Sequence, residues 1–333
     1  MTAATERQRQ ERKGGWLAPL EATDLRVGGV AALVAEVVYF TTAAPSITFL
    51  DSGELVTAAA GFGVPHPTGY PLWTFLAWLF TWLPLGHTAW EVNLFSGVCA
   101  ALATGIVAAL LSHGGRRLGV EPRPAQVLAF GLASCFALTT SVWSQAVIAE
   151  VYTLHVLIVA ILLLVLYRWL LDPDWPAGFL TAVFVLSVGL TNHHLVLALA
   201  PLPLLVAFLV QRRLALELTA YCAGAGAVVY IAFGSLSAEA TMQETAFRSV
   251  QLAVALFVSV VLLRHRLQAW KTGLALLPVV AVGLLPYAYL PLASSTNPPM
   301  NWGYTRTPDG FFYSVNRSPY QSPLSTQLQD TVG

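Results

Sequence analysis

The sequence predicts an all-α protein, a polytopic bundle of transmembrane helices. Of its 333 residues, 56% are hydrophobic and only 10% are charged, whereas a soluble globular domain carries roughly 25% charged residues. Apolar runs of about 20 residues, the length that crosses a bilayer, recur along nearly the whole chain. The formal net charge is zero, so the composition gives no indication of a nucleic-acid partner.

We expect about nine spans. The first follows a polar, basic N-terminus over residues 1–26, and because no small-residue cleavage pattern follows it, we interpret it as a retained span. A further apolar segment, residues 70–84, is short and bounded by Pro71 and Pro84, so we expect it to form a re-entrant or interfacial helix in the first outer loop. The nine spans are expected at 27–48, 92–112, 125–141, 151–171, 176–190, 195–211, 215–235, 249–263 and 272–290.

The basic residues predict the orientation of this bundle. If residues 70–84 do not cross, 14 of the 17 Lys and Arg side chains fall on the cytoplasmic side, as the positive-inside rule requires. If they crossed, the pairs Arg116–Arg117 and Arg212–Arg213 would move outside. We therefore expect a multi-pass cell-membrane protein with residues 1–26 in the cytoplasm and a polar tail, residues 294–333, outside.

The chain is expected to form one domain. No internal repeat and no low-complexity linker divides residues 1–333, so we predict a single integral membrane domain, and the stop after a polar stretch is consistent with a fragment of a longer protein. The three cysteines, Cys99, Cys135 and Cys222, lie in apolar runs without paired spacing. They are interpreted as small core residues rather than disulfides or metal ligands.

Polar residues gather at the outer ends of the predicted spans. Asp51 and Glu54 follow the first span as D-S-G-E, a spacing that suits a capping box and also places both carboxylates on one helical face, where Asp51 could act as a general base. His66, in the rigid turn PHPTGYP, is either a hydrogen-bonded turn residue or a substrate contact. Glu150, at the head of a span, is either an interface residue exposed to water or a functional carboxylate.

Common catalytic and metal-binding motifs are absent from the sequence. It holds no P-loop, zincin motif, G-x-S-x-G elbow or C-x-x-C pair. His193 and His194 would point about 100° apart on a helix and would make a poor pair of metal ligands. We therefore assign no metal ligand and leave any divalent-metal requirement open. The residues alone predict an outward-facing polar site that handles a substrate at the membrane surface.

Two other classes of protein remain as alternatives. A secondary transporter is also a polytopic bundle, but it is expected to show paired halves and polar residues near the bilayer midplane. Here the polar residues collect at one membrane face, and no two halves can be paired. A noncatalytic membrane scaffold would not need carboxylates, imidazoles and arginines to gather on one side.

Several motifs carry a resemblance to a known family. D-S-G-E at 51–54, H-P-T-G-Y-P-L at 66–72 and V-N-L-F-S at 92–96 resemble glycosyltransferase family 117, bacterial multi-pass proteins whose family also includes the eukaryotic transmembrane protein 260, a protein O-mannosyltransferase. The resemblance runs from about Thr41 to Tyr320. Further matches are W-S-Q-A-V-I-A-E-V-Y at 143–152, N-H at 192–193, and the block with N-P-P-M-N-W-G and R-T within 285–307.

The resemblance implies a GT-C glycosyltransferase with an extracytoplasmic active site. It implies a polyprenyl-phosphate sugar as donor, mannose as the first guess for the sugar, an acceptor protein or glycan, surrounding membrane lipids as partners, and no bound cofactor. Asp51 matches the acidic residue of the first outer loop and is expected to be the base, with Glu54 beside it. The expected substrate-binding residues are His66, Tyr70, Asn93, Glu150, Tyr152, Asn192, His193, Trp302 and Arg306.

An arginine on the outer side is expected to stabilise the departing phosphate. Arg306 is preferred to Arg317 because it lies in the matched block, whereas Arg317 is interpreted as a solvated loop cation. This sequence is shorter than many members of the family, which continue with further spans or a soluble C-terminal domain.

Overall fold

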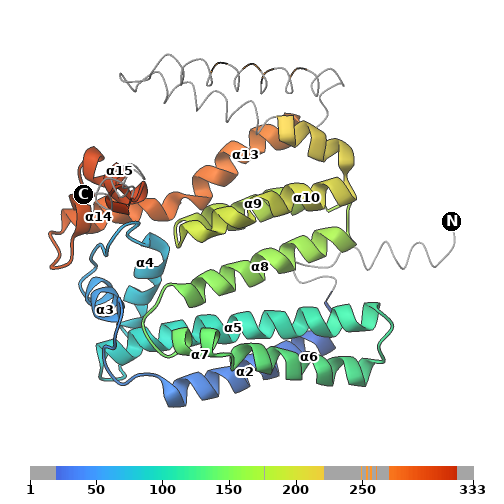
Figure 1. The fold of residues 1–333 in the computed structure, drawn as a ribbon, viewed down its shortest axis with the longest axis horizontal. Helices are drawn as coiled ribbons and strands as arrows, with labels where there is room; N and C mark the ends of the chain where they lie inside the picture. The colour runs from blue at the N-terminus through green and yellow to red at the C-terminus, as the bar shows by residue number, and fades with distance from the viewer. Residues whose placement is uncertain are drawn as a thin grey trace, which may run out of the picture. The chain divides into compact units, whose positions relative to one another are not determined.

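A computed structural model describes residues 20–175, 177–220 and 270–320, together with single residues at 249, 253, 256 and 260 (Figure 1). Of the predicted spans, most of 249–263 and most of 215–235 lie outside the described residues. Within the described residues the secondary structure is helical and contains no strand, so the predicted all-α class is confirmed. An isolated bridge joins Val64 to Asn301.

Twelve α-helices and four 3₁₀ turns have defined bounds within the described residues. They are α2 (Ala22–Thr42), α3 (Ser52–Ala60), α4 (Pro71–Phe80), α5 (Thr88–Arg117), α6 (Pro122–Ala137), α7 (Thr140–Ala146), α8 (Tyr152–Leu171), α9 (Gly178–Leu190), α10 (Pro201–Val210), α13 (Trp270–Gly283), α14 (Tyr289–Ser295) and α15 (Pro308–Val315). The 3₁₀ turns are η1 (His194–Leu199), η2 (Leu285–Ala288), η3 (Trp302–Tyr304) and η4 (Ser318–Tyr320).

Four helical segments among the described residues are long and apolar enough to cross a membrane: Ala22–Thr42, Thr88–Arg117, Tyr152–Leu171 and Lys271–Ser295. The pair α6 and α7, bent by 66°, would make a fifth if it is one span. The predicted number of about nine is therefore not confirmed. The predicted spans 176–190 and 195–211 correspond to shorter apolar segments, Gly178–Leu190 and His194–Val210.

Helix α4 bears on the orientation of the chain. It has 10 residues, so it is about 15 Å long, half of the roughly 30 Å of a bilayer's hydrocarbon core. Pro71 occupies its first turn, where the missing N–H costs nothing because that group has no partner within the helix. This length agrees with the expectation that residues 70–84 do not cross.

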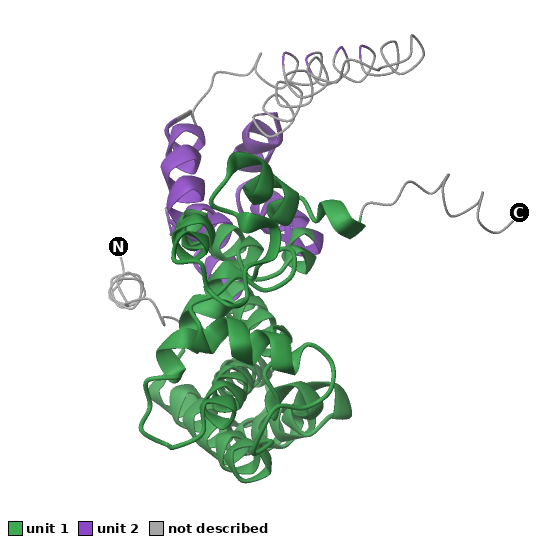
Figure 2. Cartoon of the chain, turned by 90° about the vertical axis from the view of Figure 1, so that its left-hand side faces the viewer, with its two compact units in different colours: residues 1–164, 185–197, 283–333 green, residues 165–184, 198–282 purple. Residues whose placement is uncertain are grey.

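The described chain divides into two compact units (Figure 2). Unit 1 comprises residues 1–164, 185–197 and 283–333, and unit 2 comprises residues 165–184 and 198–282. That residues 1–333 form a single domain remains a prediction. All of the residues expected to form the site belong to unit 1.

Small residues bring α2 and α5 of unit 1 into close contact. A Cβ atom on Gly28 would lie 2.6 Å from the carbonyl oxygen of Gly105, so the two backbones meet where neither helix has a side chain. Ala31 and Ala108 are buried in the same contact. Such small-residue interfaces are typical of membrane helices, which gain no hydrophobic energy by leaving lipid and associate through close packing.

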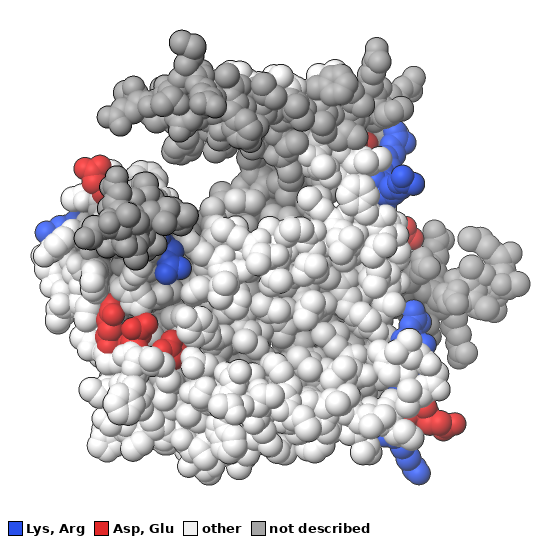
Figure 3. Space-filling model, in the orientation of Figure 1, with Lys and Arg blue, Asp and Glu red and all other residues white. Residues whose placement is uncertain are grey.

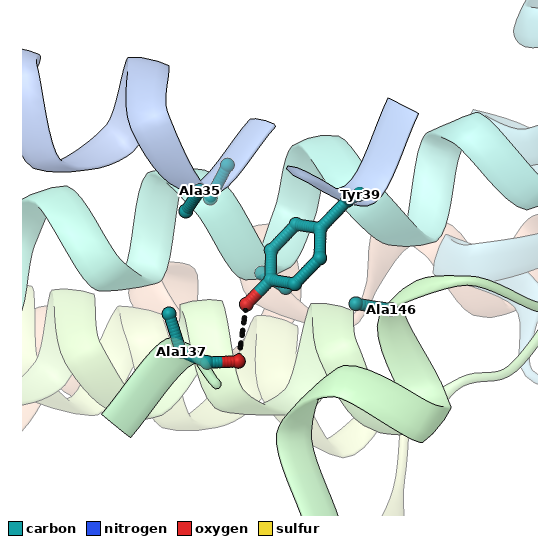
Figure 4. Close-up of a cluster of buried hydrophobic side chains, with 6 residues drawn as sticks. Ala35, Tyr39, Ala137 and Ala146 are labelled. Carbon is teal, nitrogen blue, oxygen red and sulfur yellow. Dashed lines mark hydrogen bonds between the residues drawn. The ribbon is translucent and has the colours of Figure 1, made fainter. Parts of the chain in front are cut away.

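Tyr39 connects α2 to the bend between α6 and α7. Its ring is buried, and its hydroxyl donates a hydrogen bond of 2.9 Å to the carbonyl of Ala137, the last residue of α6, as Figure 4 shows. Carbonyls in the last turn of a helix lack a partner within the helix. Ala35 and Ala146 pack in the same cluster.

Apart from Glu36, which lies within α2 with a carboxylate oxygen buried near Gly97 of α5, the charged side chains of the α2–α5–α6 layer lie near the ends of its helices. At one end the buried Asp24 accepts hydrogen bonds from Ser112 Oγ (2.7 Å) and from the Arg116 guanidinium (2.6 Å). Over these helices the face seen in Figure 3 is uncharged between the two ends. This is the pattern that a lipid-facing surface requires.

Candidate active site

Asp51 stands at the entrance to α3 with its carboxylate unused by the helix. It occupies the N-cap position, but its side chain makes no capping hydrogen bond, and 58% of it is exposed. The capping box that the D-x-x-E spacing suggested is therefore wrong. The reason is that the Glu54 carboxylate is bound to His66 instead of the N-cap backbone.

The loop before Asp51 is held by Asn93. This residue of α5 is fully buried and donates from Nδ2 to the carbonyls of Ala44 (2.7 Å) and Ser46 (3.2 Å). These bonds fix the segment that connects α2 to α3. In this structure Asn93 supports the site, while its predicted contact with substrate remains a prediction.

Glu54, His66 and Tyr70 form a hydrogen-bonded chain. Glu54 Oε1 accepts from the backbone N–H of His66 (2.6 Å), and Glu54 Oε2 lies 3.2 Å from His66 Nδ1. On the other side of the imidazole, His66 Nε2 lies 2.8 Å from the Tyr70 hydroxyl and 4.0 Å from Asp51 Oδ2. His66 thus lies between the two carboxylates of the D-S-G-E motif.

The turn PHPTGYP produces this geometry. Pro65 and Pro67 restrict the backbone on both sides of His66. Gly69 has φ = +79°, a conformation that glycine adopts without the strain of a side chain. Its N–H donates to the His66 carbonyl (2.7 Å) and closes the turn. The chain then enters α4 at Pro71, with the Tyr70 ring directly before it.

The charges of Glu54 and His66 stabilise each other. Burial raises the pKa of Glu54, but its hydrogen bonds and ion pair with His66, and a hydrogen bond from Trp302, lower it by more, so its pKa falls below the usual value. The hydrogen bond to Glu54 raises the pKa of His66. Both shifts favour an ion pair of carboxylate and imidazolium. Burial raises the pKa of Tyr70, so this hydroxyl keeps its proton.

Glu150 is buried beside these charges, with 3% of its surface exposed. Its backbone carbonyl accepts from Trp73 Nε1 (3.0 Å) and from Ser96 Oγ (3.3 Å), which anchors the start of α8 against α4 and α5. Burial, together with the negative charge of Asp51, raises its pKa to about 7. Of its two interpretations, the water-exposed interface residue is excluded by this burial.

Four aromatic rings lie side by side next to the Glu54–His66–Tyr70 chain. The Tyr70 and His193 rings are stacked, with centroids 6.0 Å apart and planes within 7°. The rings of Tyr152 and His155 lie 5.5 and 5.9 Å from His193. Burial lowers the pKa of His193 to about 4, so this ring is neutral. Its Nδ1 accepts from the Leu195 N–H (3.1 Å), which leaves the proton on Nε2.

Asn192 connects two helices at the same end of unit 1. It is fully buried and donates from Nδ2 to the carbonyl of Val151 (3.3 Å). The Leu72 N–H, at the start of α4, donates to the Thr191 carbonyl (3.3 Å). These bonds place His193 against Tyr70, although the two are more than 120 positions apart in the sequence.

Residues after α14 complete the site from the far end of the chain. The Val64 N–H donates to Met300 (2.9 Å), and the Trp302 N–H donates to Val64 (3.0 Å), which places Trp302 beside Glu54. Arg306 is exposed, donates to Asn297 and lies 5.7 Å from the Tyr304 ring. Its observed contacts are thus with its own segment.

Arg317, which the sequence placed below Arg306 as a candidate, lies close enough to the site to act on it electrostatically. Its positive charge contributes to lowering the pKa of His193 and His194 and acts on His66 and Tyr70 as well. It is half-buried, and its guanidinium lies 4.9 Å from the Tyr320 ring. The sequence indicates Arg317 only through its place among the three arginines expected outside the cell. It favours Arg306 because Arg317 lies beyond the motifs shared with the family.

Asp51, Glu54 and His66 could also hold a cation. One ligand atom from each lies within 4.8 Å of the others. Among the described residues, this is the cluster of His, Cys, Asp or Glu side chains whose spacing could suit a metal ion. Oxygen and imidazole donors suit several divalent metals. Both oxygens of Glu54 are engaged with His66, however, so a metal would have to replace those bonds.

The chain is similar to known proteins over this region. A family model described as the N-terminal domain of protein O-mannosyl-transferase TMEM260 matches residues 51–217, just over half of the chain, and begins at Asp51. Protein O-mannosyl-transferase TMEM260 of Mus musculus is 40% identical over 144 residues, which are 43% of this chain and 19% of the relative.

A second relative extends the match. Protein O-mannosyl-transferase tmem260 of Dictyostelium discoideum is 30% identical over 192 residues, which are 53% of this chain and 22% of the relative. The chain thus matches about a fifth of the length of these curated relatives. No solved structure matches it. On the family match, the chain belongs to the TMEM260 N-terminal domain family, which confirms the resemblance inferred from its motifs.

Proposed function

We propose that this protein is a membrane mannosyltransferase that moves mannose from a polyprenyl-phosphate carrier to an acceptor hydroxyl on the extracytoplasmic face. Its relatives carry the name protein O-mannosyl-transferase, which supports mannose as the sugar and a protein as the acceptor. The observation that carries the proposal is the Asp51 carboxylate. It is exposed, free of capping and 4.0 Å from a histidine that a second carboxylate holds in place.

Asp51 is the base in this mechanism. Its carboxylate accepts the proton of the acceptor hydroxyl while that oxygen forms a bond to the anomeric carbon of the sugar. The bond between the anomeric carbon and the phosphate oxygen breaks in the same step, and the lipid phosphate leaves with its electron pair. The sugar is thereby transferred with inversion.

Positive charge beside Asp51 stabilises the leaving phosphate. The pairing of His66 with Glu54 favours an imidazolium close to Asp51, and Arg317 adds a guanidinium whose charge reaches the same groups. Cationic donors that are already in place when the negative charge develops contribute strongly to catalysis. We assign the phosphate contact to Arg317 in place of Arg306, because the contacts of Arg306 lie in its own segment.

The rings and Glu150 form the rest of the proposed site. Tyr152, of which 44% is exposed, offers a ring against which a sugar can pack, and the buried, neutral His193 supports it from 5.5 Å away. Glu150 is buried, and burial together with the charge of Asp51 raises its pKa to about 7, so below that pH it carries a proton and can donate a hydrogen bond where an ionised carboxylate could not. We propose that it orients the substrate.

A donor panel tests this proposal. The purified chain is incubated with polyprenyl-phosphate mannose, polyprenyl-phosphate glucose and a nucleotide-linked mannose, each with and without an acceptor protein. The expected result is release of the polyprenyl phosphate from the mannose donor, dependent on the acceptor. Release from the nucleotide donor alone would contradict the lipid carrier, and no transfer from any donor would contradict an active enzyme.

A further inference from the structure

Unit 2, shown in purple in Figure 2, contains a cavity of about 610 Å³ that has no part in the proposed transfer. This volume is within the range of small-molecule sites, roughly 300–1,000 Å³. The cavity lies where helices of unit 2 begin and end. Its lining comes from the end of α8 (Trp169), the loop to α9 (Asp174 and Trp175), the start of α9 (Phe179), residues 211–214, Glu217 and Thr272.

The lining has one cation available for an anion. Arg213 lies 3.6 Å from Glu217, and Glu217 is buried, so these two charges are paired. Arg212 is exposed at the cavity, and the structure gives it no ion pair with another described residue. A guanidinium presents up to five N–H donors in a plane that matches the oxygens of a phosphate.

Aromatic rings held in place form the wall of the cavity. The guanidinium of Arg168, a residue only 7% exposed, lies 4.1 Å from the Trp175 ring and fixes it by a cation–π contact. Trp169 packs edge-on against Phe179 with ring centroids 6.0 Å apart. Gln211 Nε2 donates to the Pro173 carbonyl (2.5 Å) and holds the adjoining loop.

Tryptophan and arginine at the ends of apolar helices are typical of the membrane interface, where lipid headgroups meet the hydrocarbon. A lipid supplies both chemistries that this lining would recognise, because its phosphate is anionic and its acyl chains are apolar. A free phosphate would leave the rings without a partner. The positive-inside rule would place the helix ends that line this cavity at the cytoplasmic leaflet.

We propose that this cavity binds the headgroup of an anionic phospholipid, with Arg212 donating to the phosphate and with the half-buried Trp175 ring against the glycerol and first methylenes. The site is independent of Asp51 and of the proposed mannose transfer. It would give the protein a bound lipid at the cytoplasmic leaflet.

The test measures lipid binding to the full chain in a neutral detergent. Dioctanoyl phosphatidylglycerol, dioctanoyl phosphatidylcholine and inorganic phosphate are titrated separately, and bound ligand is counted by native mass spectrometry. The expected result is one saturable phosphatidylglycerol, with phosphatidylcholine weaker. Arg212→Gln should weaken phosphatidylglycerol binding about tenfold, the effect of losing one charge-assisted hydrogen bond. The matched control is Arg123→Gln, an exposed arginine of unit 1, which should bind like the parent.

A second variant and a folding control complete the experiment. Trp175→Leu removes the ring but keeps the charges, and it should also weaken phosphatidylglycerol binding. Thermal unfolding without lipid shows that each variant is folded. Equal losses in Arg212→Gln and Arg123→Gln would mean nonspecific attraction and would overturn the site. Equal binding of phosphatidylcholine, or inorganic phosphate bound as tightly as the lipid, would overturn the assignment to an anionic lipid.

Discussion

Glu54 acts on the site through His66, because both of its carboxylate oxygens are directed at that one residue. The ion pair keeps the imidazole oriented between Tyr70 and Asp51. Without the Glu54 charge, a mostly buried imidazole would lose the partner that raises its pKa. Glu54 is therefore a positioning residue in this account, while Asp51 is the residue that meets the acceptor.

Glu54→Gln should have a moderate effect on both stability and turnover. It removes the charge but keeps a hydrogen-bonding oxygen, so we expect a loss of about 1.5–3 kcal/mol in the free energy of unfolding, the contribution of a hydrogen bond to a charged group. Turnover should fall less than in Asp51→Asn. Thermal unfolding in detergent and a transfer assay measure the two effects, with the exposed Asp309→Asn as control. Unchanged stability would show that the ion pair contributes nothing.

Glu150 should make stability depend on pH. Its folded pKa of about 7 lies above the ordinary value of 4.5. Between these values the folded protein keeps a proton that the unfolded chain releases, so stability falls as pH rises from 4.5 through 7. Thermal unfolding of the parent and of Glu150→Gln is compared across this range. The difference between them isolates Glu150 from Asp51 and His66, which face it, and a constant difference would contradict the raised pKa.

Arg317 and Arg306 form a matched pair for testing the phosphate contact. Arg317→Gln should raise KM for the lipid-linked donor about tenfold, because one charge-assisted hydrogen bond to the phosphate is lost. Arg306→Gln should leave KM nearly unchanged, since Arg306 contacts Asn297 and Tyr304. Steady-state kinetics with varied donor decide between them. The reverse ranking would restore the prediction that the sequence motifs favoured.

At the scale of the helices, two adjacent glycines of α2 are expected to respond differently to the same substitution. Gly28→Ala would place a Cβ 2.6 Å from the backbone oxygen of Gly105, so we expect a loss of about 1–3 kcal/mol, as for overpacked cores. Gly29→Ala meets nothing within 4 Å and should be neutral. Thermal unfolding of the two variants tests the interface, and equal effects would contradict the close contact between α2 and α5.

Helix positions were predictable from local apolarity, and helix ends were predictable only in part. The first span was expected to reach residue 48 because the segment stays apolar, but α2 ends at Thr42, shortly before Pro45, whose ring disfavours helix in the residue before it. The span 125–141 was expected to be one helix, yet it is bent after Ala137. Ala137 accepts its hydrogen bond from Tyr39, 98 positions away, and no local pattern contains that contact.

For the whole molecule, the residues of the site divide into those that a local motif reveals and those that only the packed fold brings near. Asp51, Glu54, His66 and Tyr70 lie within 20 positions, so their motif was visible in the sequence. Arg317 acts electrostatically on His66 and Tyr70, and backbone hydrogen bonds that join Val64 to Met300 and Trp302 bring its segment to this end of unit 1. Pairing over more than 230 positions is decided by the packed fold and not by local sequence.

Orientation of the whole chain can be tested with introduced cysteines. Ser318→Cys should react with a membrane-impermeant thiol reagent in intact cells. Leu118→Cys, at a site 87% exposed after α5, should react only after the cells are opened, because the positive-inside rule places Arg116 and Arg117 in the cytoplasm. Labelling of Leu118→Cys from outside would mean that residues 70–84 cross, and the orientation would be reversed from that point.

The most direct test of the proposed function is the turnover of Asp51→Asn with polyprenyl-phosphate mannose and an acceptor protein. The substitution keeps the size of the side chain, and since that side chain makes no cap, thermal stability should be unchanged. If Asp51 is the base, turnover falls by roughly 10²–10⁴-fold, the usual contribution of general acid–base catalysis, while Asp309→Asn retains the parent rate. A folded Asp51→Asn protein with a normal rate would contradict the assignment of Asp51 as the catalytic base.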